Sequence, residues 1–436
     1  ILILQVRILR QSQQKLQPNP PSPATRHAPA SARGRAGSPG STPKARVEGL
    51  ACFGGTPCFD RPVSTSNLVR PDVERFLAYS KRFHEARRYT NDGPLVKELE
   101  TRLARFHGSR HCIATSNGFW ALVLAMRCMA RPAREEVVMP SLTYRRMADI
   151  VAWAGLVPRF CEVDADTLAI SPATATEHVG DATALLLAVH PVVNCCDAPG
   201  LEVLARKAGV PLLFDAVESA YETVGGRKVG SFGDAECFSM HASKLINGFE
   251  GGYVTTSDDA LAARLRCMRG FGFQGHDNTI EAGLNAKLNE VHAAMALASL
   301  DDLEDQVLRN RGRYRCYQRE LARIPGMRLL RFDEREQTSF KNIVVELTPA
   351  WPLSRARTLE ILNAEGALAR AYYHPPLHAR PASYRTFAEA LPLTDELSNR
   401  FMLLPCGHHV TEDDVVTVCG LLAFVRRHAG AIRSRL

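Results

Sequence analysis

The sequence predicts an α/β protein built on a mostly parallel sheet, followed by a smaller α+β domain. Between residues 111 and 256, short apolar runs typical of buried strands alternate with segments whose apolar residues recur every three or four positions. Strands and helices that alternate through short connections favour a parallel sheet with helices packed on its faces. From Met327 onward the character of the sequence changes, which indicates a second, smaller domain.

The elements expected in the large domain follow from these runs. Its strands are expected at residues 111–115, 136–139, 156–163, 183–189, 210–215, 236–239 and 253–256. Its helices are expected within 71–106, at 119–129, from an opening at 140–144, at 200–208 and 260–268, and within 287–323. The small domain is expected to have strands at 327–331, 342–347 and 368–373, and helices at 354–365 and from 412 onward.

Length and composition set the domain organisation. The 436 residues are enough for two lobes, which we expect at residues 46–305 and 306–436. Residues 1–45 are rich in Pro, Ser, Gln and Arg and show no periodic apolar face, so a disordered basic tail is expected there. The tail is also rich in Arg and poor in acids, a composition that superficially fits a transit peptide.

Charge and hydropathy exclude two classes of partner. Of the 54 Lys and Arg residues, eight lie in residues 1–47, which contain no acid, and the remainder balances the 46 Asp and Glu residues. A neutral body gives no case for binding nucleic acid. No apolar run approaches the roughly 18 residues of a membrane span, so no membrane partner is expected.

The twelve cysteines are scattered, with no C-x-x-C pair and no ligand spacing with histidine. This pattern predicts reduced, mostly buried thiols in a cytoplasmic protein and no metal site.

Lys244 is the candidate catalytic residue. It stands in a polar turn between the expected strand that ends at Ser239 and the one that begins at Tyr253. A buried ammonium is costly unless it is paired or its pKa falls, and a neutral lysine amine can form a Schiff base with an aldehyde cofactor. The alternative is a solvated lysine on a surface hairpin, which is the usual place for a lysine.

Asp215 and a glycine turn strengthen the catalytic interpretation. Asp215 ends an apolar run, and the carboxyl ends of parallel strands are where open α/β sheets place their ligands. Pyridoxal phosphate needs such a carboxylate to keep its pyridine nitrogen protonated, together with a Schiff-base lysine. Ser116-Asn117-Gly118 joins a strand to a helix, where free N–H groups can bind an anion, although most such connections bind no phosphate.

Eight ordered motifs resemble one family, the DegT/DnrJ/StrS sugar aminotransferases, which are fold-type-I pyridoxal-phosphate enzymes. The resemblance runs from about Thr90 to Phe424. The motifs are TNDGP at 90–94, SNG at 116–118, PSLTY at 140–144, FDAVE at 214–218, FGDAECFSMHASK at 232–244, FEGG at 249–252, GLNAKLNEVHAA at 283–294 and YHPPLH at 373–378.

The resemblance implies a role for each matching residue. Lys244 would be the Schiff-base lysine that also moves the substrate proton, and Asp215 the partner of the pyridine nitrogen. The remaining cofactor contacts would be Tyr144 stacked on the ring, Gly118, Phe119 and Ser239 at the phosphate, Glu218 near the phenolate oxygen, and Asn285 reaching the phosphate of a neighbouring subunit in a homodimer.

The resemblance also implies a reaction. The amino group of L-glutamate would pass to a nucleotide-linked keto sugar, and residues 269–278 are most similar to the branch acting on dTDP-4-keto-6-deoxyglucose. Two alternatives stay open: an aminotransferase for a cyclitol or other keto substrate, and a non-catalytic relative that binds cofactor or sugar as a sensor or partner subunit.

Two positions depart from the family pattern. Phe119 replaces the usual threonine of the phosphate turn, which leaves only a backbone N–H to donate. Glu218 replaces the usual Gln or His, and its carboxylate should repel the phenolate oxygen of the cofactor unless it is protonated.

Overall fold

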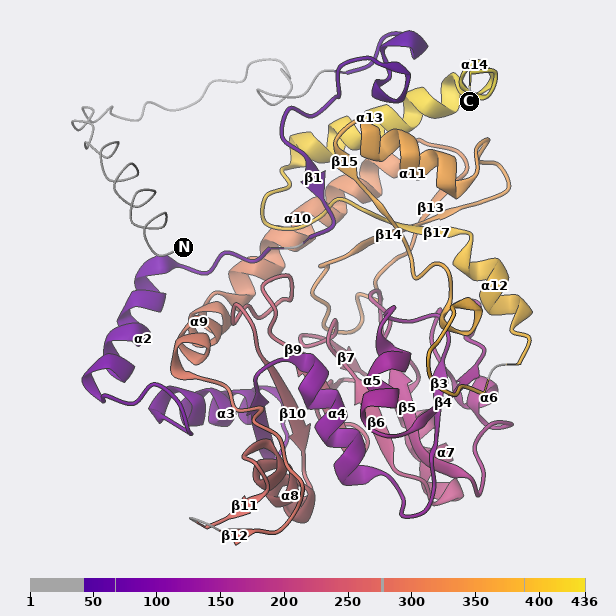
Figure 1. Ribbon diagram of the computed structural model, residues 1–436. Coiled ribbons are helices and arrows are strands. Elements are labelled where there is room, and N and C mark those ends of the chain that lie inside the picture. The colour runs from indigo at the N-terminus through magenta and orange to yellow at the C-terminus, as the bar shows by residue number, and fades with distance from the viewer. Residues whose placement is uncertain (1–42, 67, 276–277, 388, 436) are drawn as a thin grey trace, which may run out of the picture. The chain divides into compact units, whose positions relative to one another are not determined.

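The computed structural model describes residues 43–66, 68–275, 278–387 and 389–435. Of the tail expected at residues 1–45, residues 1–42 therefore lie outside the described residues. The described chain contains a seven-stranded sheet, the centre of what we call the large lobe, and a four-stranded sheet, the centre of the small lobe (Figure 1).

The sheet of the large lobe is mostly parallel, as the sequence predicts. Its strand order is β2-β10-β9-β6-β5-β3-β4, and β10 alone pairs antiparallel with both of its neighbours. The strands are β2 (His111–Thr115), β3 (Glu136–Pro140), β4 (Val157–Cys161), β5 (Thr183–Val189), β6 (Leu212–Asp215), β9 (Ala235–Ser239) and β10 (Gly252–Thr256).

Both faces of this sheet are buried, which explains why its strands have continuous apolar runs. Leu186 and Phe214 face one core, whereas Leu187 and Leu213 face the other, as the alternation of side chains along a strand requires. Helices α3 (Pro94–His107), α7 (Ala198–Ala208) and α9 (Glu290–Asp301) pack into the first core. Helices α4 (Gly118–Met129), α5 (Met147–Trp153) and α8 (Asp259–Arg269) pack into the second.

The small lobe has an antiparallel sheet with strand order β13-β14-β17-β16. Its strands are β13 (Met327–Leu329), β14 (Ile343–Leu347), β16 (Arg370–Ala371) and β17 (Phe401–Leu404), and its helices are α11 (Arg355–Ala364), α12 (Pro392–Ser398), α13 (Glu412–Arg427) and α14 (Ala429–Arg433). The expected strand at 368–373 is divided, because Ala367–Leu368 (β15) pairs instead with Val63–Ser64 (β1).

Helix α10 (Leu303–Leu321) connects the lobes. Its first two turns contribute Leu303 and Val307 to a core of the large lobe, whereas Tyr314 and Tyr317 lie in the core of the small lobe. A boundary between the two lobes at residues 305 and 306 therefore stays a proposal. The segment Val47–Val63, although it precedes the large lobe in the sequence, contributes side chains to the small-lobe core.

The remaining elements are short or peripheral. They are η2 (Val47–Gly49), η3 (Ala51–Phe53), α2 (Val73–Glu85), α6 (Pro172–Ala175), β7 (Thr223–Val224), β8 (Arg227–Lys228), β11 (Phe273–Gln274), β12 (Asn278–Thr279) and η4 (Leu377–Ala379). The helix expected to open at 140–144 begins only at Met147, because Pro140 still belongs to β3 and Met147 N–H donates to the carbonyl of Tyr144 in a turn. None of the described helices is both long and apolar enough to cross a membrane.

Candidate active site

A cavity of about 610 Å³ lies where the carboxyl ends of β5, β6 and β9 meet the small lobe. It brings together seven of the eight residues that the sequence predicts: Gly118, Phe119, Tyr144, Asp215, Glu218, Ser239 and Lys244. This is the edge of a parallel sheet at which ligands are expected to bind.

Lys244 reaches the cavity from the loop between β9 and β10. Its backbone N–H donates to the carbonyl of His241 at 2.8 Å, and its ammonium donates to one carboxylate oxygen of Glu218. Burial alone would lower the pKa of Lys244, but the negative charges of Glu218 and Asp215 raise it above its ordinary value. Lys244 is thus a charged lysine at a cavity wall, and no longer a candidate for a solvated hairpin residue.

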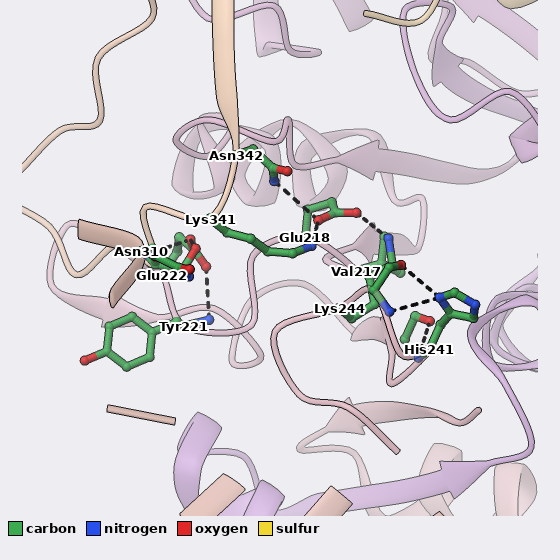
Figure 2. Close-up of polar contacts among 12 residues, drawn as sticks. Val217, Glu218, Tyr221, Glu222, His241, Lys244, Asn310, Lys341 and Asn342 are labelled. Atoms are coloured by element: carbon green, nitrogen blue, oxygen red, sulfur yellow. Dashed lines mark hydrogen bonds and ion pairs between the residues drawn. The ribbon is translucent and has the colours of Figure 1, made fainter. Parts of the chain in front are cut away.

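Glu218 is ionised and shared between two lysines. One carboxylate oxygen accepts from Lys244, and the other lies 2.5 Å from the ammonium of Lys341 (Figure 2). Burial would raise the pKa of the Glu218 carboxyl, but Lys244 and Lys341 together lower it to about 2. The ionised Glu218 was expected to repel the phenolate oxygen of the cofactor. The positive charges of Lys244 and Lys341 offset this repulsion, so Glu218 need not be protonated.

Asp215 ends β6 and is 2 % exposed. Burial raises the pKa of its carboxyl to about 6, while a hydrogen bond from the Val217 N–H at 3.1 Å and the charge of Lys244 act in the opposite direction. A carboxylate with this pKa is ionised at neutral pH and, since it is poorly hydrated, is well placed to pair with a cationic ring nitrogen.

The turn before α4, which we call the anion turn, presents N–H groups of the kind that bind an anion. Asn117 caps the helix by accepting from the Trp120 N–H at 2.9 Å. The N–H groups of Gly118 and Phe119 have no intrahelical acceptor, because they lie in the first turn of the helix. A Cβ on Gly118 would lie 2.9 Å from the Cβ of Ser239, and so glycine is required for the turn to approach Ser239. Two N–H groups and a hydroxyl are a suitable donor set for a phosphate.

Tyr144 and Asn285 differ in their relation to the cavity. Tyr144 lines it and is 46 % exposed, as a residue that offers its ring to a stacked ligand would be. Asn285 does not line the cavity of its own chain, and its side chain accepts from Lys287 at 2.7 Å. Whether it reaches a neighbouring subunit stays a prediction.

Sequence reasoning missed the side of the cavity that the small lobe contributes. Lys341, Asn342, Arg370 and Tyr373 all line it, and so does His190, which directly follows β5. Lys341 had a usable signal, because it lies two residues before the buried run of β14, as Lys244 lies in the connection between the buried runs of β9 and β10.

The chain is similar to known proteins over most of its length. Residues 72–423 match the model of the DegT/DnrJ/EryC1/StrS aminotransferase family. The chain is 29 % identical to GDP-perosamine synthase of Caulobacter vibrioides, over 76 % of this chain and 90 % of that protein. It is 25 % identical to dTDP-4-amino-4,6-dideoxy-D-glucose transaminase of Shigella dysenteriae, over 81 % and 96 %. Among solved structures, DesI crystallised in the presence of its TDP-sugar product is similar with a TM-score of 0.84 and 35 % identity, covering 89 % of this chain and 99 % of that one.

Proposed function

Because the chain belongs to the DegT/DnrJ/EryC1/StrS aminotransferase family and is a sugar aminotransferase of fold type I, we propose that it transfers the amino group of L-glutamate to a nucleotide-linked keto sugar. The observation that carries this proposal is the meeting of Lys244, Asp215 and the anion turn of α4 in one cavity. These three features come from separate segments of the chain, and each supplies a different requirement of amino transfer.

Pyridoxal phosphate is the cofactor that this donor set fits. When bound, it supplies an electron sink for the carbon that gains or loses the amino group. Gly118, Phe119 and Ser239 would hold its phosphate, and Asp215 its ring nitrogen. Tyr144 would lie against the ring, and Lys244 would carry the amine that binds its carbonyl carbon.

The residues of the chain have defined tasks in this reaction. Lys244 is charged in the structure, so it must lose a proton before its amine can act as a nucleophile, and Glu218 is the group in direct contact with that proton. Once free, the same amine can carry the proton between the substrate carbon and the cofactor. Because the pKa of Asp215 is about 6, its carboxylate is ionised at neutral pH and can stabilise a protonated ring nitrogen.

The sugar substrate is proposed as dTDP-4-keto-6-deoxyglucose. The Shigella dysenteriae transaminase and the TDP-sugar product of the DesI crystals support this choice, because both concern thymidine-linked sugars. The similarity to GDP-perosamine synthase makes a guanosine-linked sugar the main competitor.

A substrate panel tests the proposal. The purified chain is incubated with pyridoxal phosphate, L-glutamate and one of the dTDP-, GDP- or UDP-linked keto sugars, and the amino sugar is measured by mass spectrometry. The dTDP sugar should give the highest kcat/KM, and the Lys244→Ala variant should give no product. Failure with every sugar, despite bound cofactor, would favour the cyclitol or non-catalytic alternatives.

A shared dimeric site is proposed on the resemblance at Asn285. Replacing Asn285 by Ala should weaken cofactor binding by roughly 1.5–3 kcal/mol, because one hydrogen bond to a charged phosphate is lost. The cofactor dissociation constant from fluorescence measures this effect, and sedimentation should report a dimer of the 48.0 kDa chain. A monomer that retains wild-type affinity would contradict the shared site.

A further inference from the structure

Lys341 is a buried cation that the proposed reaction does not yet use. Its side chain is only 4 % exposed, yet it lines the cavity and its ammonium lies 2.5 Å from Glu218. Asn342 approaches the same carboxylate oxygen at 3.5 Å (Figure 2). Burying an ammonium costs free energy of desolvation, so the presence of Lys341 at this cavity wall indicates a functional role.

The two residues that precede Lys341 are held in place by their own contacts. The preceding residue, Phe340, has a φ of +49°, which is unusual for an aromatic residue, and it is fixed by ring contacts with Tyr314 and Phe332 at 5.2 and 5.3 Å. Ser339 donates through both its hydroxyl and its N–H to Glu222, at 2.6 and 3.2 Å. The segment is thereby fastened to the large lobe next to the cavity.

The two lysines on Glu218 differ in what the reaction asks of them. Lys244 must release Glu218 whenever its amine engages the cofactor, which would leave a carboxylate that is only 15 % exposed without that partner. Lys341 has no such task and can stay in place. We propose that Lys341 is a positioning residue of the active site, which holds the Glu218 carboxylate beside Lys244 and balances its charge while Lys244 is engaged.

This proposal gives a reason for the departure at Glu218. The Glu218–Lys341 pair has no net charge, so it can stand where the family usually has a neutral side chain. The proposal rests on the proposed function only in its use of Lys244, and it can be tested without any reaction.

The test is the pH dependence of acetic anhydride labelling of Lys244 in the full-length, cofactor-free chain, read by peptide mass spectrometry. The Lys341→Met variant loses a positive charge near Lys244, so the labelling midpoint should rise by about one pH unit. Glu218→Gln loses the anion and should lower the midpoint by at least as much. The double variant should fall between wild type and Glu218→Gln.

Controls separate this role from simple packing. Other titratable groups facing the cluster are Asp215, His190, Tyr144, Tyr372, Tyr373 and Cys406, and all are unchanged in every variant. Lys228→Met removes a half-buried lysine that does not line the cavity, and it should leave the midpoint unchanged. Lys341→Arg keeps the positive charge, so the labelling midpoint of Lys244 should also stay at its wild-type value.

The outcome that would overturn the proposal is a midpoint in Lys341→Met equal to that of Lys228→Met. Lys341→Gln replaces the methionine variant if that chain does not fold, with the same rise expected. Because labelling needs neither cofactor nor sugar, a failure here is independent of whether the chain transfers amines.

Discussion

Two glutamates in this protein bind lysine, and their surroundings differ. Glu365 is fully buried, accepts from the N–H groups of Ala51 and Cys58 at 2.7 and 2.8 Å, and pairs with Lys44 at 2.9 Å. Lys44 in turn donates to the carbonyls of Gly49 and Thr56, so the cluster is closed. Glu218, by contrast, accepts from two lysines at the wall of a cavity.

The difference separates structural from chemical use of one residue pair. In the Glu365 cluster every partner is fixed, and its ions anchor the N-terminal segment to the small lobe. In the Glu218 cluster one partner, Lys244, makes a single polar side-chain contact within the described part of the chain, and it can leave that contact without unfolding the chain, because Lys341 remains. Substitutions should therefore affect mainly stability at the first cluster and mainly chemistry at the second.

Lys244→Ala should show the largest effect. Removing the only amine proposed to bind the cofactor covalently should lower kcat by at least about 10⁴-fold, comparable with the loss of a nucleophile in other enzymes. Thermal unfolding of the cofactor-free variant should stay close to wild type. A variant that still transfers amines at more than a hundredth of the wild-type rate would remove Lys244 from its role.

Glu365→Gln should act on stability instead. The substitution leaves the ammonium of Lys44 buried without a counter-charge, and breaking such a pair costs about 3–5 kcal/mol. Urea unfolding measures the loss, and kcat of the folded fraction should be unchanged. If kcat fell and the unfolding free energy did not, the contrast between the clusters would be wrong.

Asp215→Asn should change the pH dependence of stability. The folded chain raises the pKa of Asp215 from 3.8 to about 6, so it binds this proton more tightly than the unfolded chain, and stability falls as pH rises through that range. The cofactor-free Asn variant should therefore be more stable than wild type by on the order of 2–3 kcal/mol at pH 8. The gain should vanish near pH 4. An equal gain at both pH values in urea unfolding would mean that ionisation is not its cause.

Phe119→Thr should have the smallest effect. It restores a hydroxyl to the anion turn and should tighten cofactor binding by about 0.5–1.5 kcal/mol. Phe119→Val is the matched control, because it has the shape of threonine without the hydroxyl and also loses the ring contact with Trp120. Equal dissociation constants for the two variants would show that the hydroxyl reaches no phosphate.

The sequence predicted the parallel sheet and its half of the cavity because both depend on local patterns. Asp215 ends an apolar strand, and Gly118 follows a strand and opens a helix, so their places at the sheet edge could be inferred from order alone. The strand β17 was missed although Phe401–Leu404 is a continuous apolar run, and the pairing of Val63 with Ala367 joins segments about 300 residues apart.

The other half of the cavity could not be inferred in this way. Lys341 meets Glu218 only because the small lobe folds back over the large one, and no pattern within either segment encodes that contact. For the same reason the sequence suggested that Glu218 must be protonated, since the charge that compensates it lies 123 residues further along the chain.

The central claim is that Lys244, rather than its neighbour Lys341, forms the covalent bond with the cofactor. The most direct measurement is reduction of the chain with borohydride in the presence of pyridoxal phosphate, followed by peptide mass mapping. One cofactor should be attached per chain, on the peptide that contains Lys244, and none should attach to the Lys244→Ala variant. Attachment to Lys341, or no attachment at saturating cofactor, would contradict the claim.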